Sequence, residues 1–134
     1  GKKFRIPTEA EWEFAARGGN KSRGYQYSGS NNLSDVAWYV ENSGSKTHPV
    51  GSKQANELGI YDMSGNVCEW CQDRFGSYSS SSLTNPTGAT SGYNRVCRGG
   101  GWALAAGYCR SSYRLYFLPV SCSDYLGLRL VLSE

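Results

Sequence analysis

The sequence predicts an α+β fold with little regular secondary structure, one clear helix near the N-terminus and short strands in the last third. The 17 glycines and the low charged content of 19% indicate turns and close backbone approaches rather than long helices. One segment carries a complete set of helix signals, and the last third contains apolar runs typical of strands. With 134 residues, 39% of them hydrophobic, we expect one globular domain over residues 1–134.

The helix is predicted within RIPTEAEWEFAARGG, residues 5–19. Thr8 is followed three residues later by Glu11, which is the spacing of a capping box, and Gly18 supplies a C-terminal stop. Apolar residues recur at helical spacing and predict a buried stripe. The residues of this expected stripe are Ala10, Phe14, Trp12 and Ala16.

The remaining elements are expected to be short. Residues 20–45 are polar and rich in Gly, Ser and Asn, with short strands or ordered loops expected at 25–27 and 36–40. A second Ser/Thr/Gly stretch, residues 76–93, predicts a long surface loop. Strands are predicted at 95–102, around 109–114, and at 128–132, where Leu alternates with Arg and Val as in a half-buried strand.

Charge and hydropathy exclude two classes of partner. The net charge is only +3 and the basic residues are scattered, so we expect no nucleic-acid partner. No apolar run approaches the roughly 18 residues that a membrane span requires, so we expect no direct membrane insertion.

The five cysteines point to structural roles rather than to a metal or redox centre. Cys68 and Cys71 form a single C-x-x-C, whereas a zinc site requires a second pair, and the chain contains one histidine, His48. A Ser-His-Asp triad would depend on His48, which lies in a loop-like Thr-His-Pro context with no nucleophile elbow. The glycine run at 99–101 lacks the spacing of a phosphate-binding loop.

Three sequence blocks resemble the formylglycine-generating enzyme (sulfatase-modifying factor) family. They are RIPTEAEWEFAARGG at 5–19, GIYDMSGNVCEWCQD at 59–73, and RVCRGGGW with CRSSYR and GLRLVL between 95 and 132. Their order and spacing are similar to the C-terminal two-thirds of that family's domain. The resemblance implies a C-type-lectin-like fold with a small, irregular antiparallel sheet.

The resemblance also indicates that catalysis is absent. The family enzyme converts a substrate cysteine to formylglycine with copper held by two cysteines, which match Leu104 and Cys109 here. A soft-metal site that lacks one of two thiolates loses its copper(I) ligation, so we expect no copper and no required cofactor. The alternative is a degenerate or active oxidase that acts on a peptide cysteine through Cys109.

A calcium loop of the family enzyme matches residues 64–69. Backbone carbonyls and one carboxylate form an oxygen set suited to a hard cation. The resemblance therefore implies a possible structural calcium site, and the alternative is a tight turn in which Glu69 caps backbone N–H groups. The implied ligands are Ser64, Gly65, Val67 and Glu69.

Residues 103–126, hereafter the variable segment, resemble the diversified region of variable proteins encoded by diversity-generating retroelements. From Ala103 to Ser133 there is no Lys, Glu, Gln, Met or Trp, and every residue can be encoded by a codon ending in a pyrimidine. Adenine mutagenesis of an asparagine codon produces this restricted set. The predicted ligand-binding residues are Ala103, Leu104, Ala105, Tyr108, Tyr113, Leu115, Tyr116, Phe117, Leu118, Val120, Ser121, Cys122, Ser123, Asp124 and Tyr125.

Aromatic content favours a binding surface. Ten tyrosines and four tryptophans exceed what a small core needs, and we expect core packing to account for the tryptophans and about half of the tyrosines. Within the variable segment, the alternatives are that Tyr113 and Leu126 pack the core, or that the whole patch is a permanent oligomer interface. The expected function is non-catalytic binding of a protein or cell-surface ligand, at a bacterial cell surface or on a phage particle.

Overall fold

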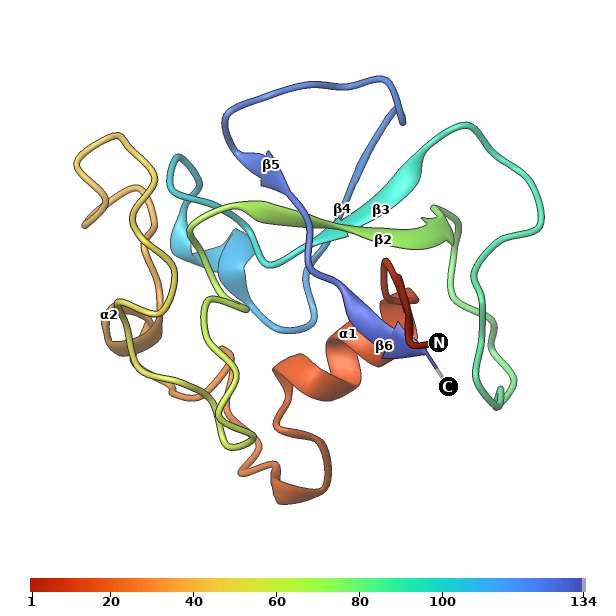
Figure 1. Ribbon diagram of the computed structural model, residues 1–134, viewed down its shortest axis with the longest axis horizontal. Coiled ribbons are helices and arrows are strands. Elements are labelled where there is room, and N and C mark those ends of the chain that lie inside the picture. Colours follow the sequence, from red (N-terminus) through yellow and green to blue (C-terminus); the bar gives the residue numbers. More distant parts are fainter. Residues whose placement is uncertain (134) are drawn as a thin grey trace.

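The structure is a computed structural model that describes residues 1–133. Its elements are β1 (Lys3–Arg5), α1 (Glu9–Ala16), the 3₁₀-helix η1 (Gly19–Lys21), α2 (Leu33–Val36), β2 (Cys68–Arg74), β3 (Arg95–Arg98), the 3₁₀-helix η2 (Ala106–Cys109), β4 (Arg114–Phe117), β5 (Leu126–Gly127) and β6 (Val131–Ser133). Long irregular segments connect them, as Figure 1 shows. The predicted α+β fold with little regular structure is therefore confirmed. No helix within residues 1–133 is long and apolar enough to cross a membrane.

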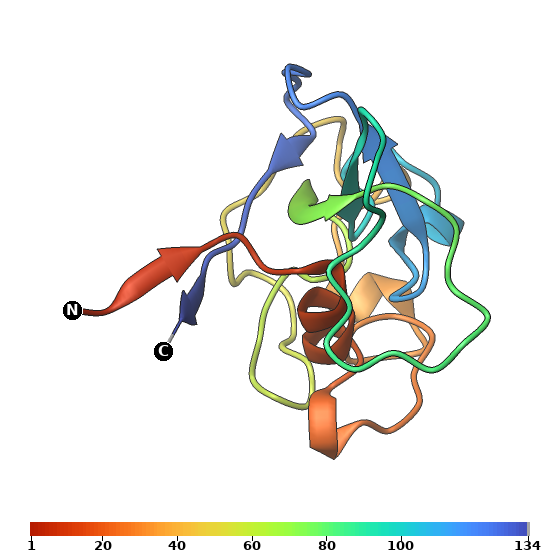
Figure 2. The same ribbon diagram turned by 90° about the vertical axis from the view of Figure 1, so that its right-hand side faces the viewer.

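A four-stranded sheet in the order β4-β3-β2-β5 forms the centre of the molecule. β3 is antiparallel to both of its neighbours, whereas β5 runs parallel to β2, so the sheet is mixed rather than wholly antiparallel. β1 and β6 form a separate antiparallel ribbon in which Phe4 lies opposite Leu132. Figure 2 shows this ribbon projecting from the body with both chain ends beside each other.

Helix α1 begins and ends where the sequence predicts. The Glu11 N–H donates to Thr8 Oγ1 at 3.2 Å and the Thr8 N–H donates to Glu11 Oε2 at 2.9 Å, which completes the capping box. The chain leaves the helix through Gly18, whose φ of +90° favours glycine. These local contacts explain why this element could be predicted from sequence alone.

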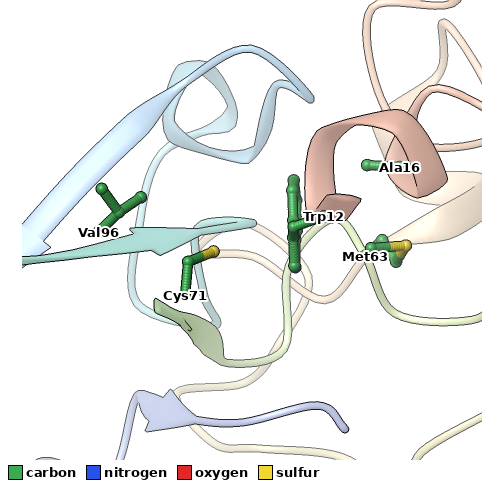
Figure 3. Close-up of a cluster of buried hydrophobic side chains, with 5 residues drawn as sticks. All are labelled: Trp12, Ala16, Met63, Cys71 and Val96. Carbon is green, nitrogen blue, oxygen red and sulfur yellow. The ribbon is translucent and has the colours of Figure 1, made fainter. Parts of the chain in front are cut away.

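The core lies between α1 and the sheet. Trp12 and Ala16 pack against Met63, Cys71 and Val96, as Figure 3 shows. The other half of the predicted stripe is wrong, because Phe14 is 56% exposed. Only the side of α1 that carries Trp12 and Ala16 faces β2 and β3, so Phe14 remains in solvent.

Several strand predictions are wrong in their limits. β3 ends at Arg98 rather than at 102, because Gly99 and Gly100 follow with φ of +99° and +72°. The piece predicted around 109–114 is not a strand; β4 begins at Arg114, and a 3₁₀-helix ends at Cys109. The expected structures at 25–27 and 36–40 are loops, apart from a single bridge at Tyr27 and the end of α2.

The leucines at 128–132 face solvent, which contradicts the half-buried strand predicted there. Leu128, Leu130 and Leu132, hereafter the leucine row, are each more than half exposed. The alternation is real, but Arg129 occupies the inward side because its Nε lies 2.9 Å from the buried Glu69 carboxylate. An ion pair thus decides which side of this segment turns inward.

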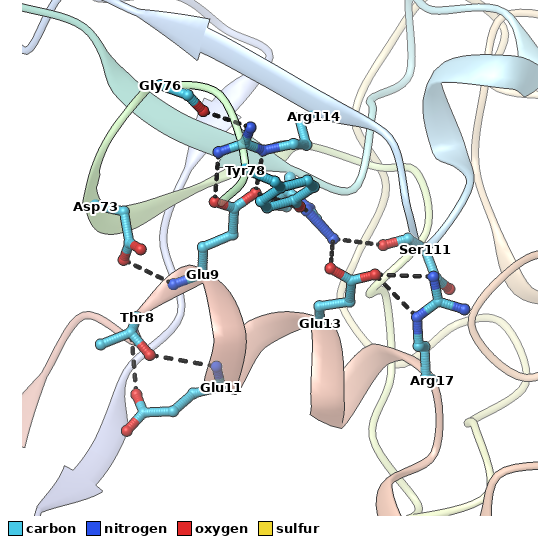
Figure 4. Close-up of polar contacts among 11 residues, drawn as sticks. Thr8, Glu9, Glu11, Glu13, Arg17, Asp73, Gly76, Tyr78, Ser111 and Arg114 are labelled. Carbon is cyan, nitrogen blue, oxygen red and sulfur yellow. Dashed lines mark hydrogen bonds and ion pairs between the residues drawn. The ribbon is translucent and has the colours of Figure 1, made fainter. Parts of the chain in front are cut away.

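A buried carboxylate joins α1 to two neighbouring strands. Glu9 Oε1 lies 2.8 Å from Arg98 Nη1. Arg114 donates to both Glu9 oxygens at 2.6 and 2.8 Å, as Figure 4 shows. Asp73 Oδ1 accepts the Glu9 N–H at 2.8 Å, which fixes the start of the helix. Arg98 is fully buried, so its charge depends on its two carboxylate partners, Glu9 and Glu13, whose Oε2 lies 2.8 Å from Arg98 Nη2.

We expect Glu9→Gln to lower the free energy of unfolding by about 3–5 kcal/mol, because the buried Arg98 loses one of its two carboxylate partners and Arg114 loses its ion pair. The matched control is Glu11→Gln, which keeps the capping box and removes only the exposed ion pair with Arg5, at a cost below about 1 kcal/mol. Urea unfolding measures both. Equal losses for the two variants would contradict the assigned role of Glu9.

Candidate functional site

The variable segment leaves the sheet after β3 and returns to it twice. It passes through η2, forms β4 at the sheet edge, loops back through 118–125 and enters β5 beside β2. Figure 1 shows this path in blue, with the loop between β4 and β5 standing above the sheet. None of the fifteen predicted ligand-binding residues is buried. Val120 is 87% exposed and Tyr116 is 52% exposed.

The pairing of β4 with β3 divides the predicted residues between two faces of the sheet. Leu115 lies opposite Cys97 and Tyr116 lies opposite Val96, which belongs to the core beneath α1. Side chains alternate along a strand, so Tyr116 turns to the α1 side while Leu115 and Phe117 turn to the other side. Tyr116 packs on Phe75, with ring centroids 4.4 Å apart. The fifteen residues therefore do not form one continuous surface.

Two aromatic groups lie on the exposed parts of the variable segment. Tyr108 and Tyr113 meet edge to face with centroids 4.9 Å apart, so Tyr113 does not pack the core. The ring centroid of Phe117 lies 5.9 Å from that of Tyr125 and 6.2 Å from that of Trp70 in β2. Sequence reasoning missed Trp70 because it assigned every tryptophan to the core. Among the described residues, Trp12 and Tyr39 are the only buried members of the two residue types.

The rest of the protein holds the variable segment through its backbone. The Val40 N–H donates to the Leu104 carbonyl at 3.0 Å, and the Cys68 N–H donates to the Tyr125 carbonyl at 2.7 Å. The Trp102 indole donates to the Asp124 carbonyl at 3.2 Å. Within residues 1–133, none of the fifteen side chains hydrogen-bonds to a residue outside the set. Replacing these side chains therefore breaks no hydrogen bond between the segment and the rest of the protein.

Side chains that do fix the segment belong to residues outside the predicted set. Arg114 binds Glu9, and Arg98 Nη2 donates to the Ser111 carbonyl at 2.7 Å. The Ser64 hydroxyl donates to the Cys109 carbonyl at 2.8 Å. Substitution of Arg98, Arg114 or Ser64 would leave a buried hydrogen-bonding group without its partner. These fixed side chains therefore flank the predicted ligand-binding residues.

Cys109 lacks the properties of a catalytic thiol. It is fully buried, and burial raises the pKa of its thiol to about 11, so almost none of it is thiolate at neutral pH. Leu104 offers no second sulfur, and within residues 1–133 no group of three or more His, Cys, Asp or Glu side chains is placed to hold a metal ion. The residues present do not fit a two-thiolate copper(I) site.

The one carboxylate of the implied calcium site already binds other side chains. Glu69 is buried; Arg129 donates to its Oε2 at 2.9 Å and the Trp12 indole donates to its Oε1 at 3.2 Å. Burial raises the pKa of Glu69, while Arg129 opposes that rise. A guanidinium beside the carboxylate repels a cation. The predicted tight turn is present, with Asn66 at φ +65°, but Glu69 binds two side chains rather than backbone N–H groups.

His48 has a structural environment. Its ring stacks on Trp38 with centroids 3.7 Å apart, and its Nε2 lies 2.6 Å from the Ser43 carbonyl oxygen. Neither ring nitrogen contacts a Ser or Cys side chain within residues 1–133, so no nucleophile–base pair is formed.

Comparison with known proteins identifies the family. The model for the sulfatase-modifying factor enzyme 1-like domain matches residues 1–134. The chain belongs to this family. It is 40% identical to the chaperone protein LppX of Paenibacillus barcinonensis over 98% of this chain and 50% of that protein, and 36% identical to the formylglycine-generating enzyme of Streptomyces coelicolor over 93% and 45%.

A solved structure of this family gives the same fold. Treponema denticola variable protein 1 superposes with a TM-score of 0.88 and 46% identity over 96% of this chain and 47% of that one. The expected C-type-lectin-like fold is therefore confirmed, as is the resemblance to a variable protein. The chain spans about half the length of the sulfatase-modifying factor relatives that it matches.

Thiol labelling distinguishes structural cysteines from a reactive one. We expect native protein to react with a maleimide at Cys122 only, because that thiol is exposed and the four other cysteines are buried. A hydrogen bond with Cys68 and burial raise the pKa of Cys97, and burial raises the pKa of Cys71. The smaller thiolate fraction slows the reaction of both thiols with maleimide further. Mass spectrometry of peptides gives the site. Rapid labelling of Cys109 without unfolding would contradict its structural role.

Proposed function

We propose that this chain is the ligand-binding part of a non-catalytic, receptor-type protein whose residues 103–126 are diversified by a retroelement through adenine mutagenesis. One observation carries the proposal: fifteen side chains reach solvent while hydrogen bonds from the scaffold hold their backbone. This arrangement suits a surface whose side chains change while its framework does not. The likeness to Treponema denticola variable protein 1 supports the same function.

Preorganisation gives this surface its binding capacity. Side chains on a backbone that is already fixed lose less conformational freedom on binding than those on a mobile loop. Tyr108, Tyr113, Phe117 and Tyr125 supply aromatic contact area, and Ser121 and Ser123 supply adaptable polar contacts. We propose a protein or cell-surface ligand, at a bacterial cell surface or on a phage particle, with no cofactor required.

The oxidase alternative has less support. It needs an activated thiol, whereas Cys109 is buried with a raised pKa, and Leu104 stands where the family enzyme has the first of its two cysteines. The exposed Cys122 lies in the variable segment, where its identity is the product of diversification in this proposal.

The DNA around the gene tests diversification directly. We expect a near-copy of codons 95–132 beside a reverse-transcriptase gene, with adenines in the copy wherever the two differ. Differences at other bases, or the absence of a copy, would refute the retroelement mechanism. The binding surface would then be a fixed one.

A display library tests tolerance and binding together. We randomise Tyr108, Tyr113, Val120, Asp124 and Tyr125. Substitutions at Val120 and Asp124 should change the free energy of unfolding by no more than about 0.5 kcal/mol, and those at the tyrosines by about 0.5–1.5 kcal/mol, because aromatic pairs but no hydrogen bond to the scaffold are lost. Selection against hen lysozyme as a model protein ligand should yield folded binders. The control library randomises the buried Cys97, Cys109 and Ser111 and should be largely unfolded. Similar folded fractions in the two libraries would contradict the proposal.

A further inference from the structure

A shallow hollow of about 330 Å³ lies at the edge of the variable segment. Most of its wall comes from the scaffold: the chain before α1, the middle of β2 and the start of β3. Its lining residues, hereafter the constant pocket, are Ile6, Trp70, Cys71, Gln72, Arg95 and Pro119. Only Pro119 belongs to the variable segment, so adenine mutagenesis of residues 103–126 leaves five of the six unchanged.

The sheet register places the constant pocket beside the predicted aromatic contacts. Cys97 of β3 lies opposite Trp70 on β2 and opposite Leu115 on β4. Arg95 of β3 lies opposite Phe117 on β4. Directly opposed residues point to the same face, so Trp70 and Arg95 share a face with Leu115 and Phe117. The Trp70 ring meets Phe117 nearly at right angles, at 79°. A ligand on this face reaches the pocket and the variable side chains together.

The charge of the pocket selects an anion. Arg95 Nη1 donates to the Gln72 carbonyl at 2.8 Å, which orients the guanidinium and leaves its other N–H groups available. No carboxylate among residues 1–133 forms an ion pair with Arg95. The pairing of β2 with β3 also sets Arg74 opposite Arg95. An arginine with no carboxylate partner is suited to bind the carboxylate of a ligand.

The walls select an apolar, planar group. Trp70 is half-buried, so part of its ring surface is open to a ligand, and Ile6 and Pro119 complete an apolar rim. We propose that the constant pocket is a fixed subsite that binds an aromatic side chain next to a carboxylate on a protein ligand. This inference rests on the proposed function, because it supplies one contact shared by every diversified sequence.

Small probes test the pocket without a natural ligand. We titrate N-acetyl-L-phenylalanine and its uncharged amide into ¹⁵N-labelled protein and follow the Trp70 indole N–H and the Arg95 Nε–H by NMR. The acid should bind with a dissociation constant on the order of 1–10 mM, and the amide about fivefold more weakly. Arg95→Gln should bring the acid to the affinity of the amide. Arg23→Gln, the same charge change at an exposed site outside the pocket, should have no effect.

The outcomes separate this inference from the proposed function. Shifts at Trp70 and Arg95 that persist in the Tyr113→Ser, Asp124→Ser variant support the pocket, whatever the DNA around the gene contains. Absence of shifts at these two groups, equal binding of acid and amide, or shifts confined to Tyr108 and Tyr113 would overturn the pocket. Diversified recognition would still stand or fall with the display library.

Discussion

The ion pairs of Glu9 are the contacts on which the rest of the structure depends. One carboxylate at the start of α1 pairs with Arg98 of β3, which Glu13 also contacts, and with Arg114 of β4, and thereby fixes the helix against two neighbouring strands. Arg98 is fully buried, so water cannot replace its partner while the fold is intact. The position of Glu9 in the first turn of the helix adds a favourable interaction with the helix dipole. The edge strand that carries Leu115 and Phe117 is thus held from its inner face, and its outer face is free.

Support and recognition are assigned to different atoms of the same segment. Carbonyl oxygens of Leu104, Asp124 and Tyr125 accept hydrogen bonds from the scaffold, and a carbonyl is the same for every amino acid. The side chains of these three residues form no hydrogen bond with the scaffold among residues 1–133. The Arg114 side chain, by contrast, does hold the segment in place, because it binds the buried carboxylate of Glu9. In the proposed function, this separation would let the side chains change while the framework of the family's fold stays the same.

Local signals predicted well and long-range pairings did not. The capping box of α1 is complete within four residues, so the sequence alone located the helix. The variable segment was located from its restricted residue types, and the structure leaves all of the proposed residues accessible. The division of Tyr116 from Leu115 depends on the register of β4 against β3, which no local pattern contains. Arg129 turns inward because it pairs with Glu69, which lies 60 residues earlier in the chain. Trp70 likewise contacts Phe117, which is distant in sequence, so neither contact could be found from a local pattern.

The leucine row has a consequence for handling the isolated chain. Leu132 lies opposite Phe4 on a two-stranded ribbon that has no further strand partner within residues 1–133, so apolar side chains and open backbone edges occur together. Such an edge is a template for strand addition between molecules. Concentrated solutions of this chain will therefore tend toward reversible clustering through the ribbon. Binding assays with the immobilised chain would then record this self-association together with weak ligand binding, unless the edges of the β1–β6 ribbon are covered.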